Sequence, residues 1–125
     1  SNPPVLAMAP LAASLEHFAA TGLPALRRKS IALTRYFEQL VLARLQGRVQ
    51  IVTPAEPAAR GAALSLRLLG LPRDRARGVF DGLRRRGILP DWREPDVIRA
   101  APVPFYNSHD DVWRCVDALD SELTP

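Results

Sequence analysis

Residues 90–109 have the sequence P-D-W-R-E-P-D-V-I-R-A-A-P-V-P-F-Y-N-S-H, and the other elements can be placed around the strand and turn that it predicts. Val97–Ala100 is a short β-type run with one arginine, Arg99, among apolar neighbours. Pro102 and Pro104 follow at once, and proline has no backbone N–H, so the strand must end there or lie at an edge. Arg99 is therefore expected near the end of a rigid element, a suitable place to bind a carboxylate.

The residues after this strand predict a final helix. Tyr106, Asn107 and Ser108 suit the cap of a helix that starts near His109. Two aspartates follow in the first turn, where carboxylates interact favourably with the helix dipole. The apolar residues recur on one face of this helix at Val112, Val116, Leu119 and Leu123.

Apolar periodicity and turn residues predict the elements before residue 90. Leu11, Leu15 and Phe18 form one stripe of an amphipathic helix that Gly22 ends. The predicted order is helices at about 11–21 and 25–46, strands at 49–53 and 63–69, a helix at 72–86, strands at 88–92 and 97–100, and a helix from 109. We therefore expect an α+β fold, a small, mainly antiparallel sheet of three to four strands covered by about four helices.

Length and composition describe one soluble globular domain over residues 1–125. No apolar run approaches the roughly 20 residues that cross a bilayer, and no signal peptide is visible, so no membrane partner is expected. Cys115 is the single cysteine and fits a reducing compartment, so a cytoplasmic location is expected.

The net charge is +4. Arg84–Arg86 is a cluster at a predicted helix end, where cations are favourable, and this explains it better than nucleic-acid binding does.

Few side chains have the spacing of a chemical site. The residues alone favour two roles of Arg99 equally. It could bind the carboxylate of a ligand, or it could form an ion pair with Asp91, Glu94 or Asp96 across a hairpin. His17 and His109 have no Cys, Ser or Asp partner at motif spacing, and we expect no metal site.

Three blocks of this sequence resemble the kynureninase family, pyridoxal-phosphate enzymes of the aspartate-aminotransferase structural class. They are S-N-P-P-V-L at 1–6, I-V-T-P-A-E-P-A-A-R-G-A-A-L-S-L at 51–66 and R-E-P-D-V-I-R-A-A-P-V-P-F-Y-N-S-H-D-D-V-W at 93–113. The blocks occur in the family's order and together extend over essentially the whole chain. The family's Arg-Gly matches Arg60 and Gly61, for which a backbone role of the glycine is favoured.

The resemblance implies two substrate-binding residues. Arg99 matches the family arginine that grips the α-carboxylate of the substrate. Asn2 matches the asparagine that contacts its carbonyl and aryl-amine end. The family's cofactor lysine and pyridine-facing carboxylate lie upstream, and Lys29, the only lysine here, has no such surroundings. We therefore expect a C-terminal small domain without its large cofactor-binding domain, inactive alone, with no catalytic or cofactor-binding residue.

The implied reaction of the full protein is hydrolysis of L-kynurenine, or 3-hydroxykynurenine, to an anthranilate and L-alanine in tryptophan degradation. Family members use pyridoxal 5′-phosphate and are homodimers, so the same is expected of the full protein. The sequence leaves open which substrate is preferred. The alternatives are a free-standing basic module that binds RNA or a protein partner, and a degenerate homologue that keeps only the fold.

Overall fold

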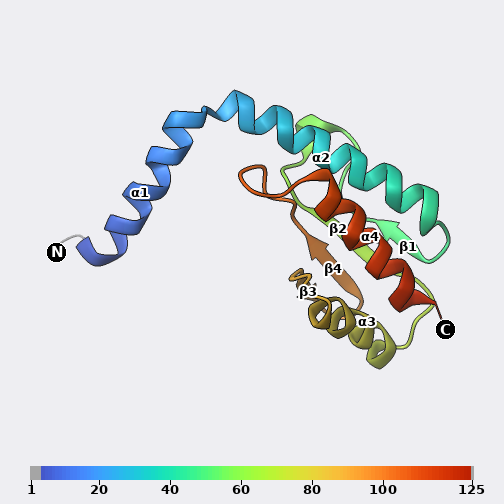
Figure 1. The fold of residues 1–125 in the computed structure, drawn as a ribbon. Helices are drawn as coiled ribbons and strands as arrows, with labels where there is room; N and C mark the ends of the chain where they lie inside the picture. The colour runs from blue at the N-terminus through green and yellow to red at the C-terminus, as the bar shows by residue number, and fades with distance from the viewer. Residues whose placement is uncertain (1–3, 125) are drawn as a thin grey trace.

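The computed structural model describes residues 4–124, and in this range the order of helices and strands is the predicted one (Figure 1). Asn2 lies outside the described residues. The elements are α1 (Val5–Thr21), α2 (Leu23–Arg44), β1 (Val49–Ile51), the 3₁₀ turn η1 (Pro57–Ala59), β2 (Leu64–Leu68), α3 (Arg73–Arg85), β3 (Asp91–Arg93), β4 (Val97–Ala100) and α4 (His109–Leu123).

The four strands form one antiparallel sheet with the order β1-β2-β4-β3. Its centre is the β2–β4 pair, in which Leu66 lies opposite Ile98 and Ser65 opposite Arg99. β3 pairs with the other edge of β4 and places Asp91 opposite Arg99. The α+β class and the antiparallel sheet are thus confirmed.

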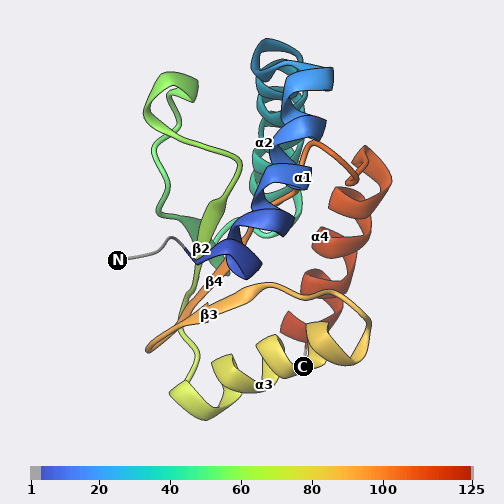
Figure 2. The same ribbon diagram turned by 90° about the vertical axis from the view of Figure 1, so that its left-hand side faces the viewer.

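One face of the sheet carries the core. Helices α2, α3 and α4 lie on that face, as Figure 2 shows with the sheet on one side and these three helices on the other. Because side chains alternate along a strand, every second residue points into this layer. The fully buried large side chains are Leu33, Phe37, Val41 and Leu45 of the α2 segment, Leu64, Leu66, Leu68 and Ile98 of the sheet, Val79 and Leu83 of α3, and Val116 and Leu119 of α4.

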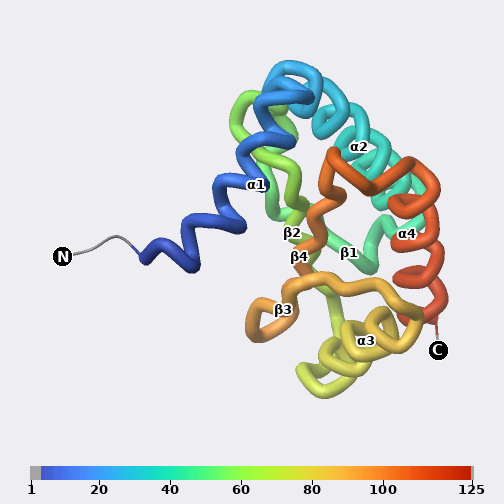
Figure 3. Tube along the Cα trace, turned by 60° about the vertical axis from the view of Figure 1, so that its left-hand side comes forward, coloured from blue at the N-terminus to red at the C-terminus, as the bar shows by residue number. Residues whose placement is uncertain are grey.

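The first helix is present but does not cover the sheet. Helix α1 contributes no buried residue and projects away from the other elements (Figures 1 and 3). The predicted stripe is exposed, with Leu11 and Leu15 each 56% accessible and Phe18 40%. At its C-terminal end, Phe18 meets Phe105 edge to face at 4.7 Å. The expectation of about four covering helices is therefore met by three, because a periodic apolar face does not identify its partner.

The third strand begins later than predicted. We expected a strand at 88–92, whereas β3 runs from Asp91 to Arg93. Pro90 has no N–H to donate to the ladder, so pairing with β4 starts after it. Ile88 and Leu89 instead lie in the connection from α3. Trp92 then packs beside Phe80 of α3, at 5.6 Å between ring centroids.

The cap of the last helix agrees with the prediction. Ser108 Oγ accepts from the Asp111 N–H at 3.2 Å, and the Asp111 carboxylate accepts from the Ser108 N–H at 2.8 Å. These reciprocal bonds form a capping box, which fixes the residue at which α4 begins. The apolar residues Val112, Val116, Leu119 and Leu123 are all buried, as expected.

Candidate substrate-carboxylate site

Arg99 lies on the face of the sheet opposite to the helices. Its neighbours Ile98 and Ala100 are buried in the core, so alternation along β4 turns Arg99 the other way. The Arg99 side chain is 43% accessible. It is therefore held by a central strand and still reaches solvent, as a ligand-binding guanidinium must.

The contacts of Arg99 combine the two interpretations that the sequence left open. Its Nη2 donates to Asp91 Oδ2 at 2.7 Å, across the β3–β4 pair. The same carboxylate oxygen lies 2.7 Å from Nη2 of Arg93, which comes from β3. Asp91 is itself 45% accessible, so this ion pair is not sealed inside the protein. An ion pair at Arg99 thus does not prevent access by a ligand.

The remaining donors of Arg99 make no hydrogen bond with residues 4–124. A guanidinium has five N–H groups, and the one bond to Asp91 leaves a forked edge that fits a carboxylate. Two guanidinium groups share one carboxylate here, so the cluster of Arg93, Arg99 and Asp91 carries a formal charge of +2 − 1 = +1. The cluster therefore keeps a net positive charge, which attracts an anion.

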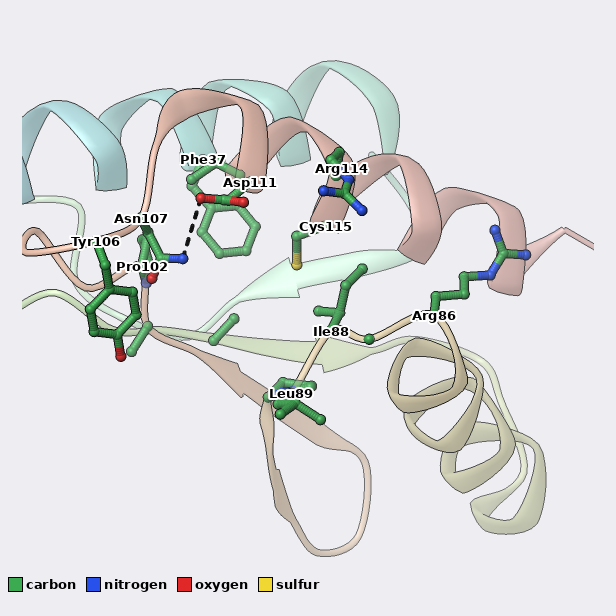
Figure 4. A pocket seen from close by; sticks show the side chains of 15 residues that line it. Phe37, Arg86, Ile88, Leu89, Pro102, Tyr106, Asn107, Asp111, Arg114 and Cys115 are labelled. Carbon is green, nitrogen blue, oxygen red and sulfur yellow. Dashed lines mark hydrogen bonds between the residues drawn. The ribbon is translucent and has the colours of Figure 1, made fainter.

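A groove of about 430 Å³ lies on the opposite, helix-covered side of the sheet, between α4, the end of β4 and the connection after α3 (Figure 4). Cys115 points from α4 toward Ile88 in this groove (Figure 4). Burial raises the pKa of the Cys115 thiol to about 11, which disfavours the nucleophilic thiolate. Arg99 is on the other face, so the groove and the arginine do not form one site.

Hydrogen bonds occupy the polar end of this groove. Asn107 Nδ2 donates to Asp111 Oδ2 at 3.4 Å, drawn as the dashed line in Figure 4. The pKa of Asp111 is lowered, first by the backbone N–H of Ser108 and then by the Ser108 and Asn107 side chains. Asp111 therefore serves the helix cap and is not suited to act as a general acid.

The sequence did not predict the role of Arg60. Its side chain is 1% accessible and pairs with Glu38 of α2 at 2.8 Å. Arg60 Nη1 also donates to the Pro54 carbonyl at 3.3 Å. Arg60 thus ties the loop before β2 to α2. The two partners are 22 residues apart, and no local pattern connects them.

The arginine cluster at the end of α3 lies where the sequence predicted it. Arg84 and Arg85 are in the last turn of the helix. Arg86 Nε donates to Glu122 Oε1 at 2.9 Å, and Arg84 lies 5.8 Å from the Phe80 ring. Two of these cations therefore have partners within the domain, which weakens the interpretation as a nucleic-acid surface.

The family model described as "Kynureninase C-terminal domain" matches residues 26–119. The chain belongs to this family. It is 54% identical over 121 residues to "Kynureninase" of Stenotrophomonas maltophilia. The aligned residues cover 97% of this chain and 28% of that protein. Proteins of the same name from Xanthomonas euvesicatoria and Xanthomonas campestris are 55% and 54% identical over the same length. The chain thus spans about 28% of the length of these relatives.

Kynureninases generally use pyridoxal phosphate, and the described part of this kynureninase domain does not fit that group. The cofactor requires a lysine in an enclosed site. Lys29 is exposed on α2 and is the only lysine of the sequence.

Within residues 4–124, no three His, Cys, Asp or Glu side chains are grouped so as to hold a metal ion. In the same range, every helix is too short or too polar to span a membrane.

Proposed function

We propose that these residues form the substrate-carboxylate-binding domain of a pyridoxal-phosphate-dependent kynureninase. The full enzyme would hydrolyse L-kynurenine, or 3-hydroxykynurenine, to the corresponding anthranilate and L-alanine. Identity of 54% over 97% of the chain to a protein named kynureninase supports this proposal. Because the chain spans 28% of that relative, the cofactor and the proton-transferring groups are assigned to a large domain outside residues 1–125.

The proposal rests on the exposure of Arg99 and on its free hydrogen-bond donors. A guanidinium that is fixed on a central strand, 43% accessible and bound by only one hydrogen bond among the described residues can grip a carboxylate with its free donors. Holding the α-carboxylate at two points fixes the orientation of an amino-acid substrate as well as its charge. Asn2 is proposed, on the resemblance alone, to contact the ketone and aryl-amine end, since an amide can both donate and accept.

The full enzyme is further proposed to be a cytoplasmic homodimer. Size-exclusion chromatography with light scattering on the full-length protein tests the dimer. A monomer at micromolar concentration would overturn it.

The experiment that tests the function is an activity assay of the full-length protein that carries this domain. Loaded with pyridoxal phosphate, it is expected to convert L-kynurenine to fluorescent anthranilate and an equal amount of alanine. Residues 1–125 alone are expected to form neither product. Absence of anthranilate from the loaded full-length protein, with both kynurenine and 3-hydroxykynurenine as substrates, would contradict the proposal.

A further inference from the structure

Two carboxylates, Asp91 and Asp96, contact arginines of the open face of the sheet, with different geometry. Asp91 contacts Arg93 and Arg99 at 2.7 Å each. Asp96 lies 3.6 Å from Arg67, a longer contact. Only the first carboxylate touches the arginine to which substrate binding is assigned. Its short distances and its position directly opposite Arg99 in the strand register distinguish it from Asp96.

We propose that Asp91 is a positioning residue that holds Arg99 ready for a substrate carboxylate, an inference that rests on the proposed function of Arg99. One Nη2 hydrogen of Arg99 is bound to Asp91 Oδ2, which favours the orientation of the long side chain that keeps this bond. An arginine that must be ordered when ligand binds loses rotamer freedom at that moment. A tethered arginine has already lost it, and the ligand then binds more tightly.

Arg93 has a defined part in this arrangement. It lies two residues after Asp91 on β3 and contacts the same Oδ2 atom, so Asp91 is held by two arginines. Because Asp91 is shared, it does not cancel the charge of both arginines, and one positive charge remains for the ligand. The cluster therefore combines a fixed guanidinium with a net attraction for an anion.

The test uses the full-length enzyme loaded with pyridoxal phosphate and the substitutions Asp91→Ala and Asp91→Asn. The Ala variant loses the tether and is expected to raise KM for kynurenine roughly twofold to tenfold, with kcat within about twofold of the wild type. The Asn variant keeps an acceptor oxygen and is expected to recover most of the affinity. Asp96→Ala is the matched control, because it removes the same charge from a carboxylate that contacts Arg67 of the open face and not Arg99.

A second ligand separates positioning from a general structural effect. The amine that lacks only the carboxylate of kynurenine is tested as a competitive inhibitor. Its Ki is expected to be equal for Asp91→Ala and the wild type. A rise of that Ki by the same factor as KM would overturn the positioning role, as would an unchanged KM in Asp91→Ala. If Arg99→Ala also leaves KM unchanged, the proposed function of Arg99 fails; if Arg99→Ala raises KM, only the role of Asp91 is lost.

Discussion

Arg60 shows how much one side chain of this domain depends on its partner. It is almost completely enclosed, and its charge is balanced by Glu38, whose side chain is 21% accessible. The Arg60 Nε atom is buried with no hydrogen-bond partner among the described residues. A buried charge that loses its counter-ion is costly, since neither water nor another side chain replaces the lost contact.

We predict that Glu38→Ala lowers the free energy of unfolding of the domain by roughly 3 kcal/mol, because it leaves the Arg60 guanidinium buried and unpaired. Urea denaturation measures this change. The double variant Glu38→Ala/Arg60→Met removes both charges and is expected to regain part of the loss. A loss below about 1 kcal/mol for the single variant would show that water reaches Arg60.

For single residues such as Arg99, the sequence predicted the position on a strand but not the ion-pair partner. The β-branched run and the two prolines located Arg99 on a strand, and three carboxylates were candidates for an ion pair. Asp91 is selected by the register, which could not be read while β3 was expected to start at residue 88. The role of Glu38 was missed for a similar reason, because its partner lies in a distant loop.

The capping box of α4 is the clearest determinant of a single element. We predict that Ser108→Ala lowers the free energy of unfolding by about 1 kcal/mol, since an N–H at the helix start loses its acceptor. Thermal or urea unfolding measures this effect. Ser121→Ala is the control, because Ser121 is exposed in the same helix and donates only to the Asp117 carbonyl. Equal effects of the two substitutions would contradict a specific role of the cap.

The carboxyl group of the same cap predicts a pH dependence. The pKa of Asp111 is lowered in the folded protein, so the folded state favours the ionised form. The resulting stabilisation is present above the unfolded pKa of about 4 and is lost as the pH falls through the lower, folded pKa. The pKa values of Asp120 and Glu94 are also lowered, by hydrogen bonds from Arg48 and Arg73 respectively, and act in the same direction.

We therefore expect the unfolding free energy to decrease as the pH is lowered below about 4, and Asp111→Asn to reduce this decrease. Urea titrations at a series of pH values measure it. A wild-type domain whose stability is constant from pH 6 to pH 2 would be inconsistent with these contacts.

The bounds of the elements were predicted with uneven success. Helices α2, α3 and α4 were placed well because their apolar periodicity and caps are local. The start of β3 was wrong because the run Ile88–Leu89 resembles a strand, whereas Pro90 prevents the ladder from extending through it. Ile88 lies outside the strands and lines the groove beside α4, a tertiary contact that no local pattern describes.

At the level of the whole described domain, residues 4–124, three helices cover the core and the fourth, α1, stands apart from it. The sheet order, β1-β2-β4-β3, could not be predicted, since both β2–β4 and β3–β4 satisfy the same alternation of side chains. The partner of α1 could not be predicted either. The apolar pattern correctly indicated a helix, but its large side chains are exposed on the described domain.

We predict that α1 adds little to the stability of the domain. The double substitution Leu11→Ser/Leu15→Ser is expected to change the unfolding free energy of residues 1–125 by less than about 0.5 kcal/mol, because both side chains are already accessible to water. Leu119→Ala is the contrasting variant and is expected to cost about 2–5 kcal/mol, because Leu119 is enclosed in the core. A loss above 1 kcal/mol for the α1 variant would show that the stripe is buried in solution.

The proposed role of Arg99 in the full-length enzyme is to bind the α-carboxylate of the substrate. The most direct measurement is KM for kynurenine of Arg99→Ala, with Arg67→Ala as the matched control from the same face of the sheet. Loss of two charge-assisted hydrogen bonds is predicted to raise KM roughly 100-fold, with the cofactor absorbance unchanged, and Arg67→Ala is predicted to stay within about threefold of the wild type. A KM for Arg99→Ala within about threefold of the wild type would contradict this role.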